Sequence, residues 1–167
     1  GRWLFPSAHW RVAHSAHAYA TDDCGQTFVD VGGATLPPWV RECEEHNFVE
    51  LKDGRLRVYM RALRGPCGCW TAESSDGGKT WGESRPANFP HTNSRVFVRR
   101  LKSGNLLLVK NGPLDKDVGR KEMTAYLSDD DGATWKGGLV LTKDSCAYPD
   151  GDQMPDGTIY ITYDNDR

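Results

Sequence analysis

The chain has 167 residues, of which 38% are hydrophobic, and a formal net charge of −2. This length is typical of one domain. The charge argues against a general nucleic-acid or membrane-surface binder, because a phosphate-binding surface needs a positive field. No stretch of about 18 apolar residues is present, so no membrane-spanning segment is predicted, and no signal-peptide pattern opens the chain.

The first part of the chain contains a turn motif that returns twice. The motif reads Ser/Thr-x-Asp-x-Gly-x-Thr-aromatic and occupies residues 21–28, 74–81 and 128–135. An Asp side chain can accept hydrogen bonds from nearby backbone amides, and Gly supplies a positive φ. The Thr and the aromatic residue then begin a strand. Each copy therefore predicts a tight turn between two strands, with the carboxylate used to hold the turn.

A second hairpin pattern alternates with the first. It reads strand, tight turn with Gly, strand, at residues 48–58, 97–108 and 152–161. Two hairpins make four antiparallel strands per unit. The Asp residues of successive turn motifs are 53 and 54 residues apart, and repeats of this kind are typical of β-propeller blades. No convincing 3.6-residue periodicity is present, so little helix is expected.

The predicted fold class is therefore all-β, a β-propeller with about three and a half four-stranded blades. Residues 1–167 are expected to be part of a single propeller domain. Its blades are expected at about residues 1–35, 46–88, 93–140 and 148–167, the last with only two strands. A closed propeller has at least four complete blades. The remaining blades, from a longer polypeptide or another chain, are expected to cover the open strand edges.

Strand direction gathers chemically distinctive residues at one end of this propeller, opposite the Asp motifs. Glu45 and Tyr148 are each expected just before the first strand of a blade. Arg61 is expected at the end of a second strand and Arg120 at the start of a third. Loops at one end of a propeller are a natural ligand site. An acid, two guanidinium groups and a phenol are thus predicted to meet there.

Asn93 and Arg95 also precede a first strand, in the third blade, and are expected to line the same pocket. Each of these residues has a structural alternative. Glu45 lies in an acidic, polar segment and could be simply solvated, the arginines could form surface ion pairs, and Tyr148 could cap the core.

Segments of the chain, in their order and spacing, resemble the sialidase (neuraminidase) family. Residues 45–61 are similar to the sialidase segment that carries the catalytic glutamate and an arginine of the carboxylate-binding triad. Arg120, eight residues before the third turn motif, resembles another triad arginine, and residues 148–163 resemble the strand pair that begins with the catalytic tyrosine. The turn motifs resemble Asp boxes (bacterial neuraminidase repeats), which other propellers share. The resemblance implies a sialidase-like propeller, six-bladed when complete.

The resemblance implies a retaining exo-α-sialidase that hydrolyses terminal sialic acid from glycoconjugates. Tyr148 would be the nucleophile, Glu45 its base, and Arg61 and Arg120 clamps on the substrate carboxylate. Arginine binds carboxylates through parallel charge-assisted hydrogen bonds. A carboxylate nucleophile would be repelled by the substrate, whereas tyrosine is neutral until a glutamate takes its proton. No cofactor is implied, and the expected partner is a sialylated or other anionic glycan.

The third triad arginine and the general-acid aspartate of the family do not map onto this chain. Pro149 follows the tyrosine where the family usually has a small polar residue, and Asp164 stands where many members have Glu. Two alternatives stay open: a sialidase-like hydrolase or lyase acting on another anionic sugar, and a non-catalytic propeller that binds glycans or a protein. A secreted or periplasmic location is favoured.

Cysteine and histidine do not suggest a metal centre. Five cysteines cannot pair fully within the chain, and the Cys-Gly-Cys sequence at 67–69 lacks the spacing of a zinc knuckle. His9, His14 and His17 lie close in sequence, but neighbouring residues on a strand alternate between its faces. No metal is therefore expected.

Overall fold

The computed structural model describes residues 1–7, 15–40, 42–63 and 67–166. Throughout these ranges the regular structure is β-strand, and no helix long and apolar enough to cross a membrane occurs in them. The strands are β1 (Trp3–Ser7), β2 (Ser15–Thr21), β3 (Val29–Thr35), β4 (Glu42–Glu50), β5 (Leu56–Ala62), β6 (Cys69–Ser74), β7 (Arg85–Pro86), β8 (Phe97–Arg100), β9 (Leu106–Asn111), β10 (Lys121–Ser128), β11 (Lys136–Gln153) and β12 (Ile159–Asn165).

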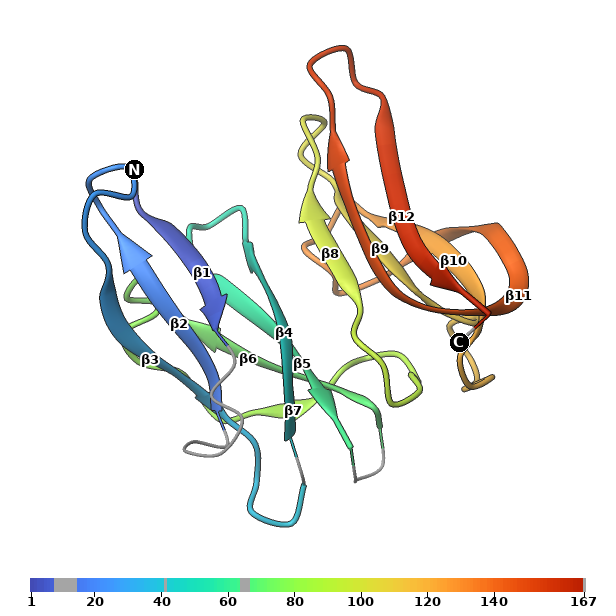
Figure 1. Ribbon diagram of the computed structural model, residues 1–167, viewed down its shortest axis with the longest axis horizontal. Helices are drawn as coiled ribbons and strands as arrows, with labels where there is room; N and C mark the ends of the chain where they lie inside the picture. The colour runs from blue at the N-terminus through green and yellow to red at the C-terminus, as the bar shows by residue number, and fades with distance from the viewer. Residues whose placement is uncertain (8–14, 41, 64–66, 167) are drawn as a thin grey trace.

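The strands form antiparallel sheets that follow one another in chain order. Strands β1 to β3 form the first sheet and β4 to β7 the second. Strands β8, β9, β10 and the first part of β11 form the third sheet, and the rest of β11 pairs with β12. Figure 1 shows these sheets as an open array rather than a closed ring. The predicted all-β class, with about three and a half propeller blades, is confirmed.

One boundary differs from the prediction. Separate strands were expected to end near residue 140 and begin near residue 148, but β11 runs without a break through both. Ser145 still pairs with Lys121 of β10, and the next residue, Cys146, pairs with Asn165 of β12. The connecting backbone stays extended because ladder partners are available to it on both sides of this point. A single strand therefore passes from the third sheet to the fourth.

The Asp motifs form the turns that the sequence predicts. In the third copy the Asp130 carboxylate accepts hydrogen bonds from the Ser128 hydroxyl at 2.7 Å, the Thr134 amide at 2.8 Å and the Thr134 hydroxyl at 2.6 Å. The same bonds form at Asp23 and Asp76. There the hydrogen bonds donated by the threonine hydroxyl and amide are the main cause that lowers the pKa of each carboxyl to about 2. These carboxylates hold turns together.

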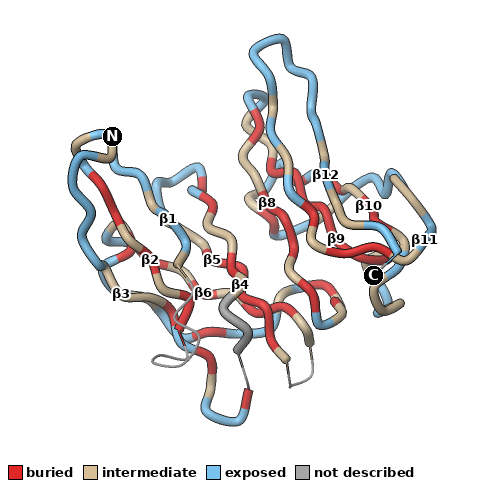
Figure 2. Tube along the Cα trace, in the orientation of Figure 1, coloured by how far each residue is buried: buried red, intermediate tan, exposed pale blue. Residues whose placement is uncertain are grey.

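Alternation along β5 shows how the core is built between sheets. Val58 and Met60 face the first sheet and pack with Trp70 and the alanines of β2 and β3. Tyr59 points the other way and stacks on Phe89, with ring centroids 6.5 Å apart. This two-residue period is the geometry of a strand buried on both faces. Figure 2 shows the buried positions concentrated along the middle strands, including β5 and β9.

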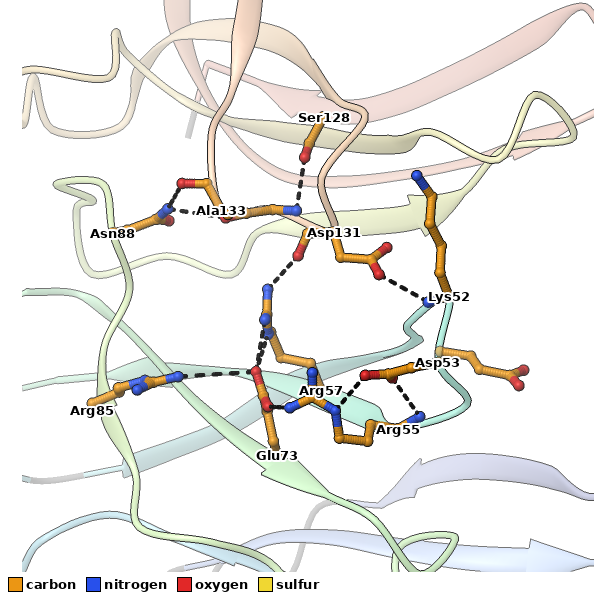
Figure 3. A network of polar contacts seen from close by, with 12 residues as sticks. Lys52, Asp53, Arg55, Arg57, Glu73, Arg85, Asn88, Ser128, Asp131 and Ala133 are labelled. Carbon is orange, nitrogen blue, oxygen red and sulfur yellow. Dashed lines mark hydrogen bonds and ion pairs between the residues drawn. The ribbon is translucent and has the colours of Figure 1, made fainter.

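A polar network joins the second and third sheets at the end that carries the Asp motifs (Figure 3). Arg57 donates two hydrogen bonds to Glu73, at 2.6 and 3.0 Å, and one to the Asp131 carbonyl at 2.6 Å. The Asp131 carboxylate accepts the Lys52 amide at 2.9 Å, and Asn88 donates to the Ala133 carbonyl at 2.9 Å. The third Asp-motif turn is thus fixed to the neighbouring sheet.

Candidate functional site

The residues singled out in the sequence come from five strands or their ends and lie close together. The positions of two of them differ slightly from the prediction. Glu45 lies within β4, which begins at Glu42, and Tyr148 lies within the continuous strand β11. Both lie at irregularities in strand register, which interrupt the ladder locally. The set is Glu45, Arg61, Asn93, Arg95, Arg120 and Tyr148.

Arg61 is at the centre of the cluster. Its side chain is only 7% exposed, and Nη1 donates to Glu45 Oε2 at 2.5 Å and to Tyr148 Oη at 3.2 Å. The carboxylate of Glu45 and the phenol of Tyr148 therefore lie side by side on one guanidinium nitrogen. A buried guanidinium is stable only with such partners, because desolvating an unpaired charge is costly.

Arg120 approaches the same tyrosine from the third sheet. Its Nη2 lies 3.5 Å from Tyr148 Oη, and its guanidinium carbon is 5.2 Å from the centre of the tyrosine ring. The corresponding distance from the Arg61 guanidinium carbon is 5.8 Å. Two cations thus face one aromatic ring and its oxygen, a cation–π arrangement. The arrangement concentrates positive charge beside Tyr148 Oη.

Asn93 connects the two arginines. Its side-chain oxygen accepts a hydrogen bond from Arg61 Nε at 2.7 Å, and its backbone carbonyl accepts one from Arg120 Nη2 at 3.0 Å. The asparagine therefore fixes the spacing between the two guanidinium groups. The sequence pattern predicted that Asn93 lines the same pocket as the arginines, but nothing in it indicated that Asn93 contacts both of them.

Arg95 holds the strand that carries the tyrosine. Its Nη2 donates to the Pro149 carbonyl at 3.0 Å and to Asp150 Oδ2 at 3.1 Å. Tyr148 itself has a φ of 53°, a left-handed conformation that costs roughly 1–2 kcal/mol for a residue other than glycine. The Arg95 contacts to the two following residues help to offset this cost. Strained backbone of this kind often occurs at functional sites.

The loop before β8, which carries Asn93 and Arg95, is held from behind by residues that sequence reasoning missed. Gly68 donates its amide to the His91 carbonyl at 2.9 Å. A Cβ at position 68 would lie 2.1 Å from the Thr92 carbonyl oxygen, so only glycine allows this approach. The His91 ring is buried, and its Nε2 donates to the Ser94 carbonyl at 3.1 Å. Burial and the nearby charge of Lys110 lower the pKa of His91 to about 3.

Lys110 adds a buried cation beside this loop. Its ammonium is fully buried and donates to the carbonyls of Asn111, Gly112 and Pro113 at 2.6, 3.0 and 2.7 Å. Burial lowers its pKa to about 8. No pattern in the sequence distinguishes Lys110 from a surface lysine, because its three acceptors are backbone atoms of a loop.

Metal-binding residues do not assemble within the part of the chain that the structure describes. No group of three or more His, Cys, Asp or Glu side chains there could hold an ion. His9 and His14 lie outside the described residues. His17 Nε2 is 2.7 Å from Asp30, and the thiols of Cys24, Cys67, Cys69 and Cys146 are free.

The fold and the cluster define an Asp-box β-propeller with an arginine-lined site at one end. The chain belongs to the family of BNR repeat-like domains, whose family model matches residues 1–161. Curated protein sequences gave no significant match.

Solved sialidase structures share the fold of this chain over part of their length. The NanB sialidase of Streptococcus pneumoniae is similar over 98% of this chain and 26% of its own, with a TM-score of 0.77 and 21% identity. The intramolecular trans-sialidase of Ruminococcus gnavus is similar over 92% of this chain and 34% of its own, at a TM-score of 0.68 and 21% identity. The Trypanosoma rangeli sialidase is similar over 90% of this chain and 25% of its own, with a TM-score of 0.64 and 17% identity. The chain thus has the fold of part of a sialidase propeller, as the sequence resemblance predicted.

Proposed function

We propose that this chain supplies part of the active site of a retaining exo-α-sialidase, with Tyr148 as the nucleophile. The observation that carries the proposal is the shared guanidinium of Arg61. Its Nη1 contacts both the Glu45 carboxylate, at 2.5 Å, and the Tyr148 phenol, at 3.2 Å. A base and a nucleophile held this close can exchange a proton when substrate binds.

The substrate class follows from the charges around the tyrosine. Arg61 and Arg120 can bind the carboxylate that sialic acid carries on its anomeric carbon. A substrate carboxylate held there would place the anomeric carbon next to Tyr148 Oη. Tyrosine suits this position because a carboxylate nucleophile would be repelled by the bound acid, and sialidases are the known tyrosine exception among glycosidases.

In the proposed reaction Glu45 accepts the phenol proton as Tyr148 Oη attacks the anomeric carbon. The glycosidic bond breaks in the same step, and the leaving-group oxygen takes a proton from the general acid. The positive charge of Arg61 and Arg120 stabilises the oxygen as it becomes negative. A glycosyl–tyrosine intermediate forms, and water then releases the sugar with retained configuration. The general acid and the third arginine would come from the rest of the propeller, because this chain spans only about a quarter of the NanB and Trypanosoma rangeli sialidases.

Turnover of a fluorogenic aryl sialoside by the complete propeller tests the proposal. Tyr148→Phe keeps the ring but removes Oη, so kcat should fall by at least about a hundredfold. Tyr160→Phe is the matched control, because this tyrosine lies on β12 and is 60% exposed, and it should retain full activity. Undiminished turnover by Tyr148→Phe would exclude the nucleophile role. Glycan binding without turnover by the unaltered protein would favour a non-catalytic propeller.

A further inference from the structure

A cavity between the second and third sheets is lined by residues outside the cluster around Tyr148. It lies beside the polar network of Figure 3, with which it shares Arg57, Arg85 and Asn88. Its volume is about 300 Å³, at the lower end of the range for small-molecule sites. Polar donors make up much of its wall. The lining includes Arg57, Tyr59, Thr71, Arg85, Asn88 and Gly132.

The ion pairs of the described residues beside this cavity contain one more positive than negative charge. Glu73 accepts hydrogen bonds from Arg55 and Arg57. Asp53 accepts a further bond from Arg55 at 2.7 Å. Arg85 lies 3.9 Å from Glu73, so three guanidinium groups share two carboxylates. Neither carboxylate lines the cavity, and the described lining therefore presents arginine charge alone.

Arg85 carries the least compensated of these charges. Its side chain is 73% exposed and makes no hydrogen bond with the described residues. Figure 3 shows it extending from β7 toward Glu73. Thr71 pairs with Arg85 across β6 and β7, so the two side chains lie on one face of the sheet. The Thr71 hydroxyl likewise makes no hydrogen bond with the described residues. A guanidinium and a hydroxyl are thus available as neighbouring donors.

The less exposed part of the cavity adds further donors. A Cβ at position 132 would lie 3.1 Å from both Arg57 Nη1 and Tyr59 Oη, so the glycine leaves space over these two groups. Burial raises the pKa of Tyr59, and its phenol therefore stays protonated. Asn88 donates to the Gly132 and Ala133 carbonyls, both at 2.9 Å. These bonds fix the turn of the third sheet that borders the cavity.

Donors on several sides of the cavity, together with the excess positive charge, favour an oxyanion. Arginine and hydroxyl groups bind oxyanions through charge-assisted hydrogen bonds. A carboxylate presents two oxygens in one plane, whereas a sulfate or phosphate ester presents three terminal oxygens in different directions. Arg57, Thr71 and Arg85 come from the adjacent strands β5, β6 and β7, so their donors suit the ester better.

We propose that this cavity binds the sulfate or phosphate ester of a glycan, with Arg57, Thr71 and Arg85 as the main donors. All of these residues belong to this chain, and none takes part in the catalysis proposed above. The inference therefore does not rest on the proposed function. It assigns the protein a second glycan contact, which holds anionic glycans independently of Tyr148.

NMR titration of the complete propeller with matched sugars tests this assignment. The Trp135 indole N–H is the reporter, because it donates to Asn88 Oδ1 at 3.3 Å. The Trp81 indole N–H is the internal control, because it donates to the Gly78 carbonyl within the second Asp motif. Galactose 6-sulfate or galactose 6-phosphate should shift the Trp135 resonance to saturation and leave that of Trp81 unchanged. The ester that binds more tightly identifies the group. Galactose should cause no shift, and galacturonic acid, with its planar carboxylate, should bind more weakly than that ester.

Two substitutions locate the binding, and a third controls for a general effect of charge. Arg85→Ala should raise the Kd of the tighter ester at least about tenfold, because it removes charge-assisted hydrogen bonds. Thr71→Val removes only the hydroxyl and should raise the Kd less. Arg99→Ala is the matched control, since the Arg99 side chain is 42% exposed on β8, outside the cavity, and pairs with Asp152 at 2.7 Å. It should leave the Kd unchanged.

Three results would overturn the assignment. They are a Trp135 resonance that neither ester shifts, galactose or galacturonic acid binding as tightly as the esters, and an unchanged Kd in Arg85→Ala. No sialoside enters these measurements, so their outcome is independent of whether Tyr148 acts as a nucleophile.

Discussion

Replacing His91 with Gln should make the stability of the protein less sensitive to mild acid. His91 lies buried beneath the loop that carries Asn93 and Arg95, and it donates one hydrogen bond to the Ser94 carbonyl. A Gln amide can donate the same bond but does not titrate. The substitution therefore removes the ionisation while retaining a donor at this position.

The size of the effect follows from the pKa of His91, which burial and Lys110 lower from 6.5 to about 3. At pH 7 the ring is largely neutral in both the folded and the unfolded protein. Below pH 6.5 the unfolded chain takes up a proton that the folded protein excludes, so stability falls as the pH falls toward 3. At 1.36 kcal/mol per pH unit, this linkage removes about 2 kcal/mol between pH 7 and pH 5.

Urea unfolding of the complete propeller at pH 7 and pH 5 measures this loss. The unaltered protein should lose about 2 kcal/mol more unfolding free energy between these pH values than His91→Gln does. Any packing cost of the Gln side chain cancels, because the unfolding free energy of each protein at pH 5 is compared with that of the same protein at pH 7. Equal losses in the two proteins would refute the reasoning, since they would mean that the ring takes up its proton without disturbing the fold.

Two further predictions concern the arginines and the loop behind them. Arg120→Lys keeps the charge but loses the planar donor pair. In titration calorimetry it should weaken the binding of sialic acid about tenfold and the binding of its neutral methyl ester much less. Equal losses of affinity for the two ligands would remove Arg120 from the carboxylate site. Gly68→Ala places a Cβ 2.1 Å from the Thr92 carbonyl oxygen and should cost at least about 1–3 kcal/mol in urea unfolding. Gly82→Ala, with its nearest contact at 3.5 Å, should cost little, and similar effects at the two sites would contradict the close approach at Gly68.

Much of the fold could be predicted because the information is local. Each Asp motif holds its own turn with bonds that span at most four residues, as the contacts of Asp130 show. The spacing of such turns then fixes the number of strands in each sheet. Strand direction was enough to bring Glu45, Arg61, Arg120 and Tyr148 to one end. Their proximity in the structure agrees with that prediction, while their chemical roles stay proposals.

The features that escaped prediction depend on contacts between sheets. The continuous path of β11 depends on ladder partners in both β10 and β12. The contacts of Arg95 with Pro149 and Asp150 join segments more than fifty residues apart. The roles of Gly68 and His91 depend on how closely two loops approach, which no hydrophobic period or turn motif records.

The central claim is that Tyr148 Oη attacks the anomeric carbon, and trapping the intermediate tests it most directly. A fluorinated sialic acid with a good leaving group forms the glycosyl-enzyme but slows its hydrolysis, because fluorine destabilises the positive charge of the transition state. Mass spectrometry of the digested propeller should then find the added sugar on the peptide that contains Tyr148. A protein that turns over sialosides yet carries the label on another residue, or carries none, would contradict the account.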